Sequence, residues 1–577
     1  MTAGVLGVTP AQDSPTERVA AAYRRIAEVD RPEVWITLRP EAEVAAEAAE
    51  VARRVAEGEE LPLAGRLVAV KDNIDVAGLP TTAACPEFAY TATETASAVE
   101  RLTAAGAVVL GKTNLDQFAT GLVGTRSPYG AVRNAVDPEL VSGGSSSGSA
   151  VAVALGVADI GIGTDTAGSG RVPAALNGIV GVKATLGVIP AHGVVPACAD
   201  YDAVTVFAAD LDLAIQAAAV MAGPESRDPR SRTWPPDVAL AARQQPRLGV
   251  PRELDLAPLS EDYRDAFAKT LAAVRESGIE TVEIDISGLL GAALLLYDGA
   301  IVAERYAAVG EFLSTGPAGA DPTVAAIIGA AAGTTGPAFA ADLDALARAR
   351  TGAAHLLRDV DGLLLPTTTE HPSIAAVQED TVGINRRMGT YTNFCNLLDM
   401  VSIAVPGAPT ATGAPFGVMV VTPTFTDQVA VDLAARVAGL DHAPLLVRDG
   451  VELAVFGAHL RGQPLHWQLE EIGARFAGEI ETTDAYRLTA LDTVPPKPGL
   501  VRHGAGQGAP IVGELYTVSR AGLGGFLTAL PAPMALTAVE LSDGRSVIGF
   551  ACTYDAALAA TDITEFGGWK AYLGRAN

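Results

Sequence analysis

The first three-quarters of the chain alternate between two patterns of apolar residues. Residues 14–57 place apolar positions at the spacing of an α-helix, and Val99–Ala105 do so again. Leu67–Lys71 and Ala107–Leu110 are short apolar runs, which predict buried strands. Helical and strand patterns keep alternating to about Gly439. This alternation predicts an α/β domain in which helices flank a mixed or parallel sheet.

The pattern changes between Asp441 and Gly450, and the rest of the chain is rich in strand signals. Asp543-Gly544 has the composition of a hairpin turn between two strand candidates. The predicted strands of this region are Val451–Phe456, Ala509–Val518, Ala535–Leu541 and Ser546–Thr553. We therefore predict two domains, an α/β domain over residues 1–445 and a smaller, β-rich α+β domain over residues 446–577.

Composition and charge narrow the classes of protein. The chain has 577 residues, of which 49% are hydrophobic, so it can bury large cores and does not resemble a disordered chain. The formal net charge of −26 repels phosphate backbones and anionic lipids, so we expect no nucleic-acid partner and no membrane partner. The charge does not exclude a small anionic substrate, because one buried arginine can dominate a pocket.

The cysteines and the N-terminus predict the compartment. The four cysteines are scattered without a CxxC pair, which fits a reducing compartment and predicts neither a disulfide scaffold nor a metal site. The first residues lack the basic and apolar segments of a signal peptide, and the apolar runs are too short to span a bilayer. We expect a cytoplasmic protein.

Two motifs match known patterns but lack the context that the chemistry needs. Gly106–Thr113 matches the phosphate-binding loop, yet its four middle residues form the predicted strand, so their N–H groups cannot cradle a phosphate. Gly144–Gly148 matches the GxSxG nucleophile elbow, which requires a strand directly before it and a histidine partner. The preceding residues have the pattern of a turn and loop. The histidines that could serve as partner are His355, His371 and His442, and none has a convincing context.

Three other segments carry candidate chemistry. Val70–Ile74 places Lys71 at the end of a predicted strand, Ser142–Ser149 is a serine- and glycine-rich loop, and Gly163–Pro173 reads GTDTAGSGRVP. Amide hydrolysis needs a nucleophile and a base that takes its proton. No histidine is near these segments in the sequence, so Lys71 is the candidate base. A lysine can act as a base only when it is neutral, and burial in an apolar strand favours that form.

The order and spacing of these segments resemble those of the amidase signature family over roughly residues 20–440. Ser169 follows Ser145 by 24 residues, as the family pattern requires. The resemblance implies a hydrolase with a Ser–cis-Ser–Lys triad, in which Ser169 is the nucleophile, Lys71 is the base and Ser145 bridges the two. The peptide bond at Ser145 is expected to be cis. No metal or other cofactor is expected.

The resemblance also implies roles for the residues around Ser169. Asp165 and Arg171 are expected to support the site from behind, although a turn residue and a structural ion pair are the simpler explanation. Gly170 stands where the family often has isoleucine or valine, which marks a subgroup. The oxyanion hole is expected to consist of the backbone N–H groups of Thr166, Ala167, Gly168 and Ser169.

Two further segments, Leu296–Tyr306 and Gly389–Asp399, resemble the allophanate hydrolases within this family. Allophanate is a urea that carries a carboxylate, so its site should hold an anion. Arg305 is suited to this, because a guanidinium can bind a carboxylate through two hydrogen bonds. Tyr297 lies eight residues earlier in an apolar stretch, so on one helix both side chains would face the same pocket. The alternative is an amphipathic helix whose arginine lies in water.

The resemblance implies a two-stage reaction. Ser169 attacks the terminal amide carbonyl and ammonia leaves, after which water releases N-carboxycarbamate, whose decarboxylation yields a second ammonia and carbon dioxide. It implies a homodimer in urea or triazine nitrogen metabolism and leaves room for association with a urea carboxylase. The alternatives are an amidase that acts on another small amide, including a glutamine amidotransferase subunit, and a scaffold without activity.

The C-terminal region contains a second candidate site. Val455–Leu465 and Gly513–Tyr516 resemble the C-terminal domain of allophanate hydrolases, whose fold is similar to that of γ-glutamyl cyclotransferases. Residues 524–531 contain no acidic residue where the cyclotransferases have their catalytic glutamate, so cyclotransferase activity is not expected. His459 is the candidate for speeding the decarboxylation. The alternative is a domain that is kept for dimer contacts or stability.

Overall fold

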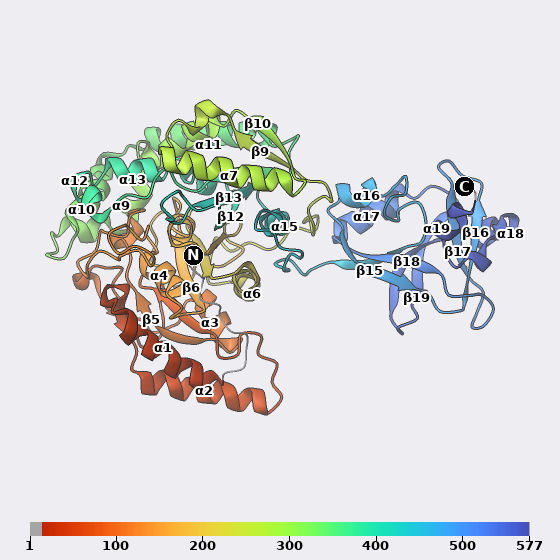
Figure 1. Ribbon diagram of the computed structural model, residues 1–577, viewed down its shortest axis with the longest axis horizontal. Helices are drawn as coiled ribbons and strands as arrows, with labels where there is room; N and C mark the ends of the chain where they lie inside the picture. The colour runs from red at the N-terminus through yellow and green to blue at the C-terminus, as the bar shows by residue number, and fades with distance from the viewer. Residues whose placement is uncertain (1–13, 576–577) are drawn as a thin grey trace. The chain divides into compact units, whose positions relative to one another are not determined.

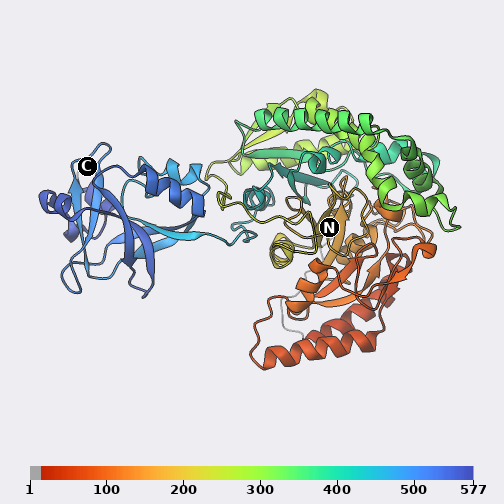
Figure 2. The same ribbon diagram turned by 180° about the vertical axis from the view of Figure 1, so that it is seen from behind.

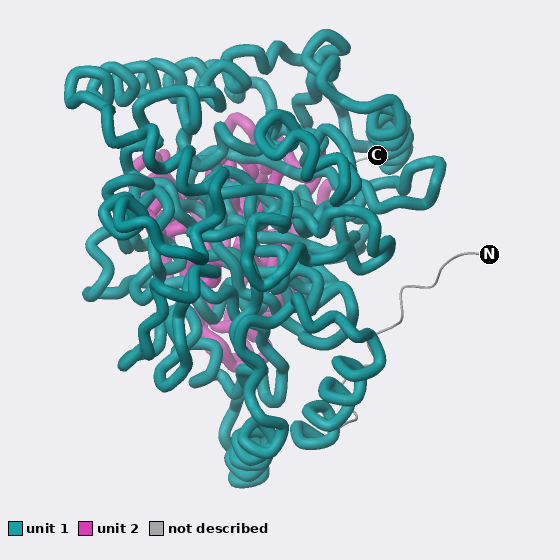
Figure 3. The backbone as a smooth tube through the Cα atoms, turned by 90° about the vertical axis from the view of Figure 1, so that its left-hand side faces the viewer, with its two compact units in different colours: residues 1–233, 246–446 teal, residues 234–245, 447–577 magenta. Residues whose placement is uncertain are grey.

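The computed structural model describes residues 14–575, which fold into two compact units (Figure 3). Unit 1 comprises residues 1–233 and 246–446, and unit 2 comprises residues 234–245 and 447–577. The segment 234–245 therefore packs with unit 2, although its sequence neighbours on both sides belong to unit 1. Within unit 2 the N–H of Leu240 donates to the carbonyl of Gly473 at 2.9 Å. The hydrophobic pattern gives no sign of so short an excursion.

A mixed sheet of eleven strands forms the centre of unit 1 (Figure 1). The strands are β1 Trp35–Leu38, β2 Leu67–Lys71, β5 Val108–Thr113, β6 Ile160–Asp165, β7 Val180–Lys183, β8 Ala203–Ala208, β9 Arg247–Pro251, β10 Glu280–Ile284, β11 Gly362–Pro366, β12 Val401–Pro406 and β13 Gly417–Thr422. Their order in the sheet is β1-β5-β2-β6-β8-β7-β12-β13-β11-β9-β10. Every residue of β2, β6 and β8 is buried, which explains their nearly continuous apolar pattern.

Helices surround this sheet (Figures 1 and 2). They are α1 Pro15–Val29, α2 Glu41–Ala56, α3 Ser97–Ala104, α4 Ser147–Ala154, α5 Val172–Asn177, α6 Leu211–Met221, α7 Glu261–Glu276, α8 Ser287–Ala293, α9 Ala303–Ser314, α10 Pro322–Ala330, α11 Gly336–Leu356, α12 Ile374–Glu379, α13 Gly383–Met388, α14 Asn393–Leu397 and α15 Asp427–Val437. The short helices α4 and α5 pack against each other and against β6 and β7, respectively. The predicted α/β domain with a mixed sheet is confirmed.

Two strands of unit 1 differ from their predictions. The helical pattern of residues 14–57 contains β1 between α1 and α2; all four residues of β1 are half-buried, so no alternation revealed it. β5 runs on through Gly111, Lys112 and Thr113, three residues beyond the predicted strand Ala107–Leu110. The Lys112 ammonium lies 3.2 Å from the buried carboxylate of Asp72. The motif is therefore part of the sheet and offers no phosphate-binding loop.

The prediction of one helix through Tyr297 and Arg305 is wrong. α8 ends at Ala293, two 3₁₀ turns follow, and α9 begins at Ala303. The chain turns at Gly299, where a Cβ atom would lie 2.4 Å from the carboxylate of Asp342. By length and composition alone this stretch could cross a membrane, but α8 packs against α11 and α14 of the same unit.

Unit 2 contains a five-stranded and a three-stranded sheet. Their orders are β15-β18-β14-β20-β19 and β17-β16-β21. The strands are β14 Val451–Val455, β15 Arg475–Glu481, β16 Tyr486–Leu491, β17 Lys497–Arg502, β18 Val512–Val518, β19 Met534–Glu540, β20 Ser546–Cys552 and β21 Thr561–Asp562, and the helices are α16 Trp467–Glu471, α17 Arg520–Ala529, α18 Tyr554–Ala559 and α19 Trp569–Gly574. The four strands predicted for this region are confirmed, and Gly544, with φ of 89°, lies in the predicted hairpin turn between β19 and β20.

Candidate active site

Two neighbouring strands bring the candidate residues of unit 1 to one edge of the sheet. β2 and β6 are parallel, with Val70 opposite Ile162, so their carboxyl ends lie side by side. Lys71 is the last residue of β2, and the segment that contains Ser169 follows β6. Ser145 belongs to the loop that leads into α4, which packs on the same strands.

Lys71 and Ser145 are in direct contact. The Nζ of Lys71 donates to the hydroxyl of Ser145 at 2.8 Å and to the hydroxyl of Thr164 at 2.8 Å. The lysine has no exposed surface, and this burial lowers its pKa from 10.5 to about 7, while the carboxylate of Asp116 opposes the shift. The peptide bond between Gly144 and Ser145 is cis. A large share of Lys71 is therefore neutral near pH 7 and able to accept a proton.

Ser169 is surrounded by unused hydrogen-bond donors. Its hydroxyl has no hydrogen-bond partner among residues 14–575, so the hydrogen bond to Ser145 that the resemblance implies is not formed in this structure. In the same described part of the chain, no acceptor faces the backbone N–H groups of residues 166–169. Gly168 has φ of 142°, and a Cβ there would lie 2.4 Å from the hydroxyl of Thr392. Successive free donors beside a serine can stabilise an oxyanion.

A buried ion pair between Asp165 and Arg171 fixes the segment that contains Ser169. Arg171 donates from Nε and Nη2 to the two carboxylate oxygens of Asp165, both at 2.9 Å, and neither residue has exposed surface. Burial would raise the pKa of Asp165, but Arg171 overcomes that effect and keeps the pKa below its usual value. The side chain of Asn396 accepts from Arg171 at 3.0 Å and donates to the carbonyl of Asp165 at 2.7 Å. These contacts fix where the chain turns after β6.

Arg305 and Tyr297 meet even though no single helix carries both. Arg305 is 1% exposed, its Nη2 donates to the hydroxyl of Tyr297 at 3.2 Å, and its Nη1 donates to the hydroxyl of Thr120 at 2.8 Å. Its buried Nε has no partner in the described part of the chain. Arg305 is connected to the loop of Ser145 through Thr120 and Asp116, because the N–H of Asp116 donates to the carbonyl of Ser145 at 3.1 Å. Burial is the main cause of the lowered pKa of Lys71, and the positive charge of Arg305 adds to it. In any guanidinium the Nε–H and one Nη2–H lie on the same edge, through which arginine can bind a carboxylate with two hydrogen bonds.

Sequence reasoning missed Asp116, a fully buried carboxylate near Lys71. Asp116 accepts from the backbone N–H groups of Gly124 and Arg126, both at 2.9 Å, and its own N–H donates to the carbonyl of Ser145 at 3.1 Å. The sequence did contain a signal for Asp116. β5 is parallel to β2, and Asp116 follows the carboxyl end of β5 just as Lys71 stands at the carboxyl end of β2. Thr164, whose hydroxyl contacts Lys71, belongs to the singled-out segment Gly163–Pro173 but was given no role. Thr120, whose hydroxyl contacts Arg305, had no distinguishing pattern.

The histidines considered for a Ser–His triad lie elsewhere. His371 is hydrogen-bonded through Nε2 to the carbonyl of Val141 at 3.0 Å. His442 is exposed and lies 3.0 Å from Asp212. His355 is exposed on α11. None of the three contacts a serine hydroxyl within residues 14–575.

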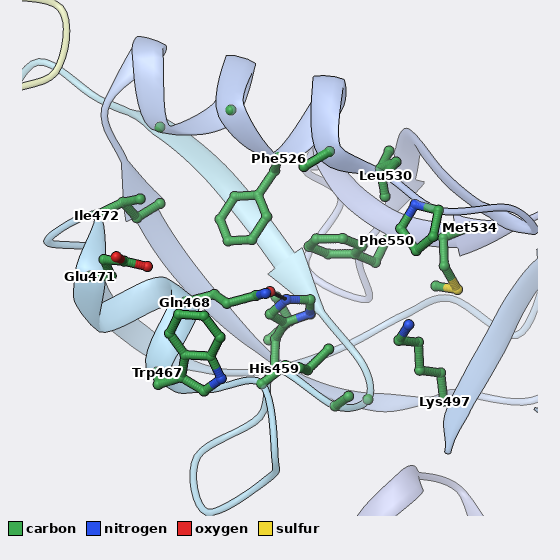
Figure 4. Close-up of a pocket in the computed structure, with 18 of the residues that line it drawn as sticks. His459, Trp467, Gln468, Glu471, Ile472, Lys497, Phe526, Leu530, Met534 and Phe550 are labelled. Carbon is green, nitrogen blue, oxygen red and sulfur yellow. Dashed lines mark hydrogen bonds between the residues drawn. The ribbon is translucent and has the colours of Figure 1, made fainter. Parts of the chain in front are cut away.

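In unit 2, His459 lines a cavity of about 660 Å³ (Figure 4). Its Nε2 donates to the amide oxygen of Gln468 at 2.8 Å, and its ring stacks on Phe550 with centroids 4.6 Å apart. Burial lowers the pKa of His459 below its usual value. Because the amide oxygen can only accept, the proton of the neutral ring is on Nε2 and Nδ1 is a free acceptor.

The domain content of the chain is shared with known proteins. Residues 17–431 match the amidase family model, and residues 451–574 match the model of the allophanate hydrolase C-terminal domain. The urea amidolyase of Lachancea kluyveri is 41% identical over 93% of this chain, but the chain spans only 31% of that protein. The matched urea amidolyases are thus about three times as long as this chain.

Solved structures of similar proteins match this chain over nearly its whole length. A Kluyveromyces lactis allophanate hydrolase is 38% identical, with a TM-score of 0.86 and coverage of 98% of both chains. The K. lactis urea amidolyase superposes equally well on 98% of this chain, which corresponds to 36% of that protein. The chain belongs to the amidase family, in the branch that carries the allophanate hydrolase C-terminal domain.

Proposed function

We propose that this protein hydrolyses allophanate to ammonia and carbon dioxide. The observation that carries the proposal is the buried Arg305, whose Nε–H has no hydrogen-bond partner among residues 14–575. Arg305 contacts Thr120, which lies four residues after Asp116, and the N–H of Asp116 donates to the carbonyl of Ser145. A buried guanidinium with open donors selects an anion, and an amidase site beside it selects an amide that carries one. Tyr297 would donate its hydroxyl to the same carboxylate.

Ser169, Ser145 and Lys71 would perform the first stage as a relay. Ser169 attacks the terminal amide carbonyl while its proton passes through the hydroxyl of Ser145 to the neutral Lys71. The backbone N–H groups of residues 166–169 stabilise the oxyanion. Lys71 then returns the proton to the leaving ammonia, and water releases N-carboxycarbamate from Ser169 by the same path. The Lys71–Ser145 hydrogen bond of 2.8 Å and the free donors beside Ser169 support these roles.

The second stage would take place at His459. N-carboxycarbamate carries two carboxylates on one nitrogen. When that nitrogen is protonated, the bond to one carboxylate carbon breaks, its electron pair stays on nitrogen, and carbon dioxide leaves. His459, whose Nδ1 is open to the cavity, would deliver the proton from water. A domain kept only for dimer contacts or stability remains the competing explanation of unit 2.

The length of the relatives supports a wider proposal. About two-thirds of the length of the matched urea amidolyases lies outside the part that this chain covers. We propose that this chain acts in nitrogen assimilation as a cytoplasmic homodimer and that it works in association with a urea carboxylase.

Ammonia counting tests the proposed function. The native protein should release two ammonia for each allophanate consumed, and biuret, in which an amide replaces the carboxylate, should be a much poorer substrate. Ammonia measured by a coupled assay and allophanate measured by chromatography give the ratio. If biuret or another neutral amide is cleaved and allophanate is not, the amidase chemistry stands but the substrate is another small amide.

The pH dependence should follow Lys71. Its pKa of about 7 separates a protonated form that cannot accept a proton from a neutral form that can, so kcat/KM should fall about tenfold per pH unit below about pH 7 and level off above it. Initial rates between about pH 5.5 and 9, with circular dichroism at each pH as the control for folding, measure this. A flat profile over this range would exclude Lys71 as the base.

A further inference from the structure

The cavity of unit 2 has an apolar wall and one cation. It lies between the end of β14, α16, α17 and the strands β17, β19 and β20 (Figure 4). Phe526, Leu530, Met534 and Phe550 form one side of it. The charged residues of the lining are Lys497, Glu471 and Asp237, and both carboxylates are exposed.

Lys497 has no counter-charge. Among residues 14–575 its ammonium forms no ion pair and no hydrogen bond, whereas Lys570 of the same unit lies 2.8 Å from the carboxylate of Glu514. Lys497 is half-buried and points toward Phe550, while Glu471 lies at the other end of the cavity, beyond His459 (Figure 4). Lys497 and His459 line the same cavity. Burial is the main cause of the lowered pKa of His459, and the charge of Lys497 adds to it. An unpaired ammonium at an apolar wall is a site for one anionic group.

The imidazole beside it is held in one orientation. Gln468 accepts from Nε2 of His459, and Phe526 packs edge-on against the ring with centroids 5.4 Å apart. The stacked Phe550 covers the other side of the ring. These contacts leave Nδ1 facing the cavity, on the side where Lys497 lies.

We propose that the unit 2 cavity binds a small dicarboxylate through Lys497 alone, with its second carboxylate unpaired against the apolar wall. This inference rests on the proposed function, in which the ligand is the dicarboxylated amine released by unit 1. Lys497 holds the carboxylate that stays with nitrogen, and the other carboxylate loses its charge as it leaves as carbon dioxide. The apolar wall disfavours the charged carboxylate and not the neutral product, so it lowers the barrier to loss of that group.

Two matched substitutions separate charge from shape. Lys497→Met keeps the length of the side chain without its charge, and Lys497→Arg keeps the charge. Malonate, which carries two carboxylates on one atom, serves as a stable probe. The probe is titrated into the full chain with Arg305→Gln, so that it cannot bind at Arg305, and the ¹⁵N signals of His459 are followed by NMR.

Malonate should shift the His459 signals to saturation in the chain with Lys497 and in the Lys497→Arg variant. The shift should be lost in Lys497→Met. Acetate should bind about as tightly as malonate, because only one carboxylate is paired. Absence of a His459 response, an unchanged response in Lys497→Met, or binding of malonate at least about 100-fold tighter than acetate would each overturn the proposal.

Single-turnover kinetics with ¹³C-allophanate connect the site to the reaction. In Lys497→Met the rate constant for release of carbon dioxide should be about tenfold or more lower than in the native chain, while the rate constant for the first ammonia is unchanged. Lys497→Arg should recover part of the rate of carbon dioxide release. The first ammonia is the internal control, because unit 1 produces it. If the native chain releases no ammonia from allophanate, the proposed function fails, while the malonate titration still decides whether Lys497 binds a dicarboxylate.

Discussion

Ser169→Ala is expected to lower kcat for allophanate by about 10⁴-fold or more, because it removes the proposed nucleophile beside the open N–H groups of residues 166–169. Binding and oxyanion stabilisation remain in the variant, so KM should change little. The rate of the first ammonia, measured with enzyme in excess over substrate, gives the effect. Combining Ser169→Ala with Lys71→Met should add little further loss, because residues that act as one relay are not additive.

Ser147→Ala is the matched control. Ser147 is a buried serine at the start of α4, two residues after Ser145, but its hydroxyl donates to the carbonyl of Asn114 at 3.3 Å and does not contact Lys71. A phosphonate probe followed by peptide mass mapping identifies the nucleophile directly. A label on Ser145, which already contacts Lys71 at 2.8 Å, would make Ser145 the nucleophile and contradict the relay.

The fold class of both units could be predicted from the sequence, because long apolar runs and alternating patterns are compatible with few arrangements of helices and strands. The strand that begins at Leu67 was predicted to within one residue, since a fully buried strand is a nearly continuous apolar run. β1 was missed because its half-buried residues carry no alternation. The segment 234–245 was missed because its partners, such as Gly473, lie more than two hundred residues away.

The residues of the candidate site also divide into some that could be predicted from the sequence and some that could not. Lys71, Ser145 and Ser169 were found because each stands in a segment whose composition is unusual, and the structure brings these segments to one edge of the sheet. Asp116 and Thr120 lie in segments of ordinary composition, and only their tertiary contacts with Ser145 and with Arg305 connect them to the candidate site. Tyr297 and Arg305 were paired through a helix that does not exist.

Arg305→Gln is expected to lower kcat/KM for allophanate by roughly 30- to 5,000-fold, which corresponds to about 2–5 kcal/mol for the loss of a buried charge that binds an anion. The neutral amide biuret should be affected by less than about tenfold. Glutamine keeps a donor near the hydroxyl of Thr120 but removes the charge. The ratio of kcat/KM for allophanate to that for biuret is the quantity to measure, because a general loss of folding changes both values together.

Arg305→Lys separates charge from geometry. Lysine keeps the charge but cannot contact Thr120 and Tyr297 while presenting two parallel donors to a carboxylate, so it should recover only part of the preference for allophanate. Tyr297→Phe should weaken the preference by less, because it removes one neutral hydrogen bond. If the ratio for Arg305→Gln equals that of the native chain, Arg305 is a structural cation that joins Ala119, Thr120 and Tyr297. The anionic substrate would then lose its main support, while the expected loss of activity in Ser169→Ala would remain unaffected.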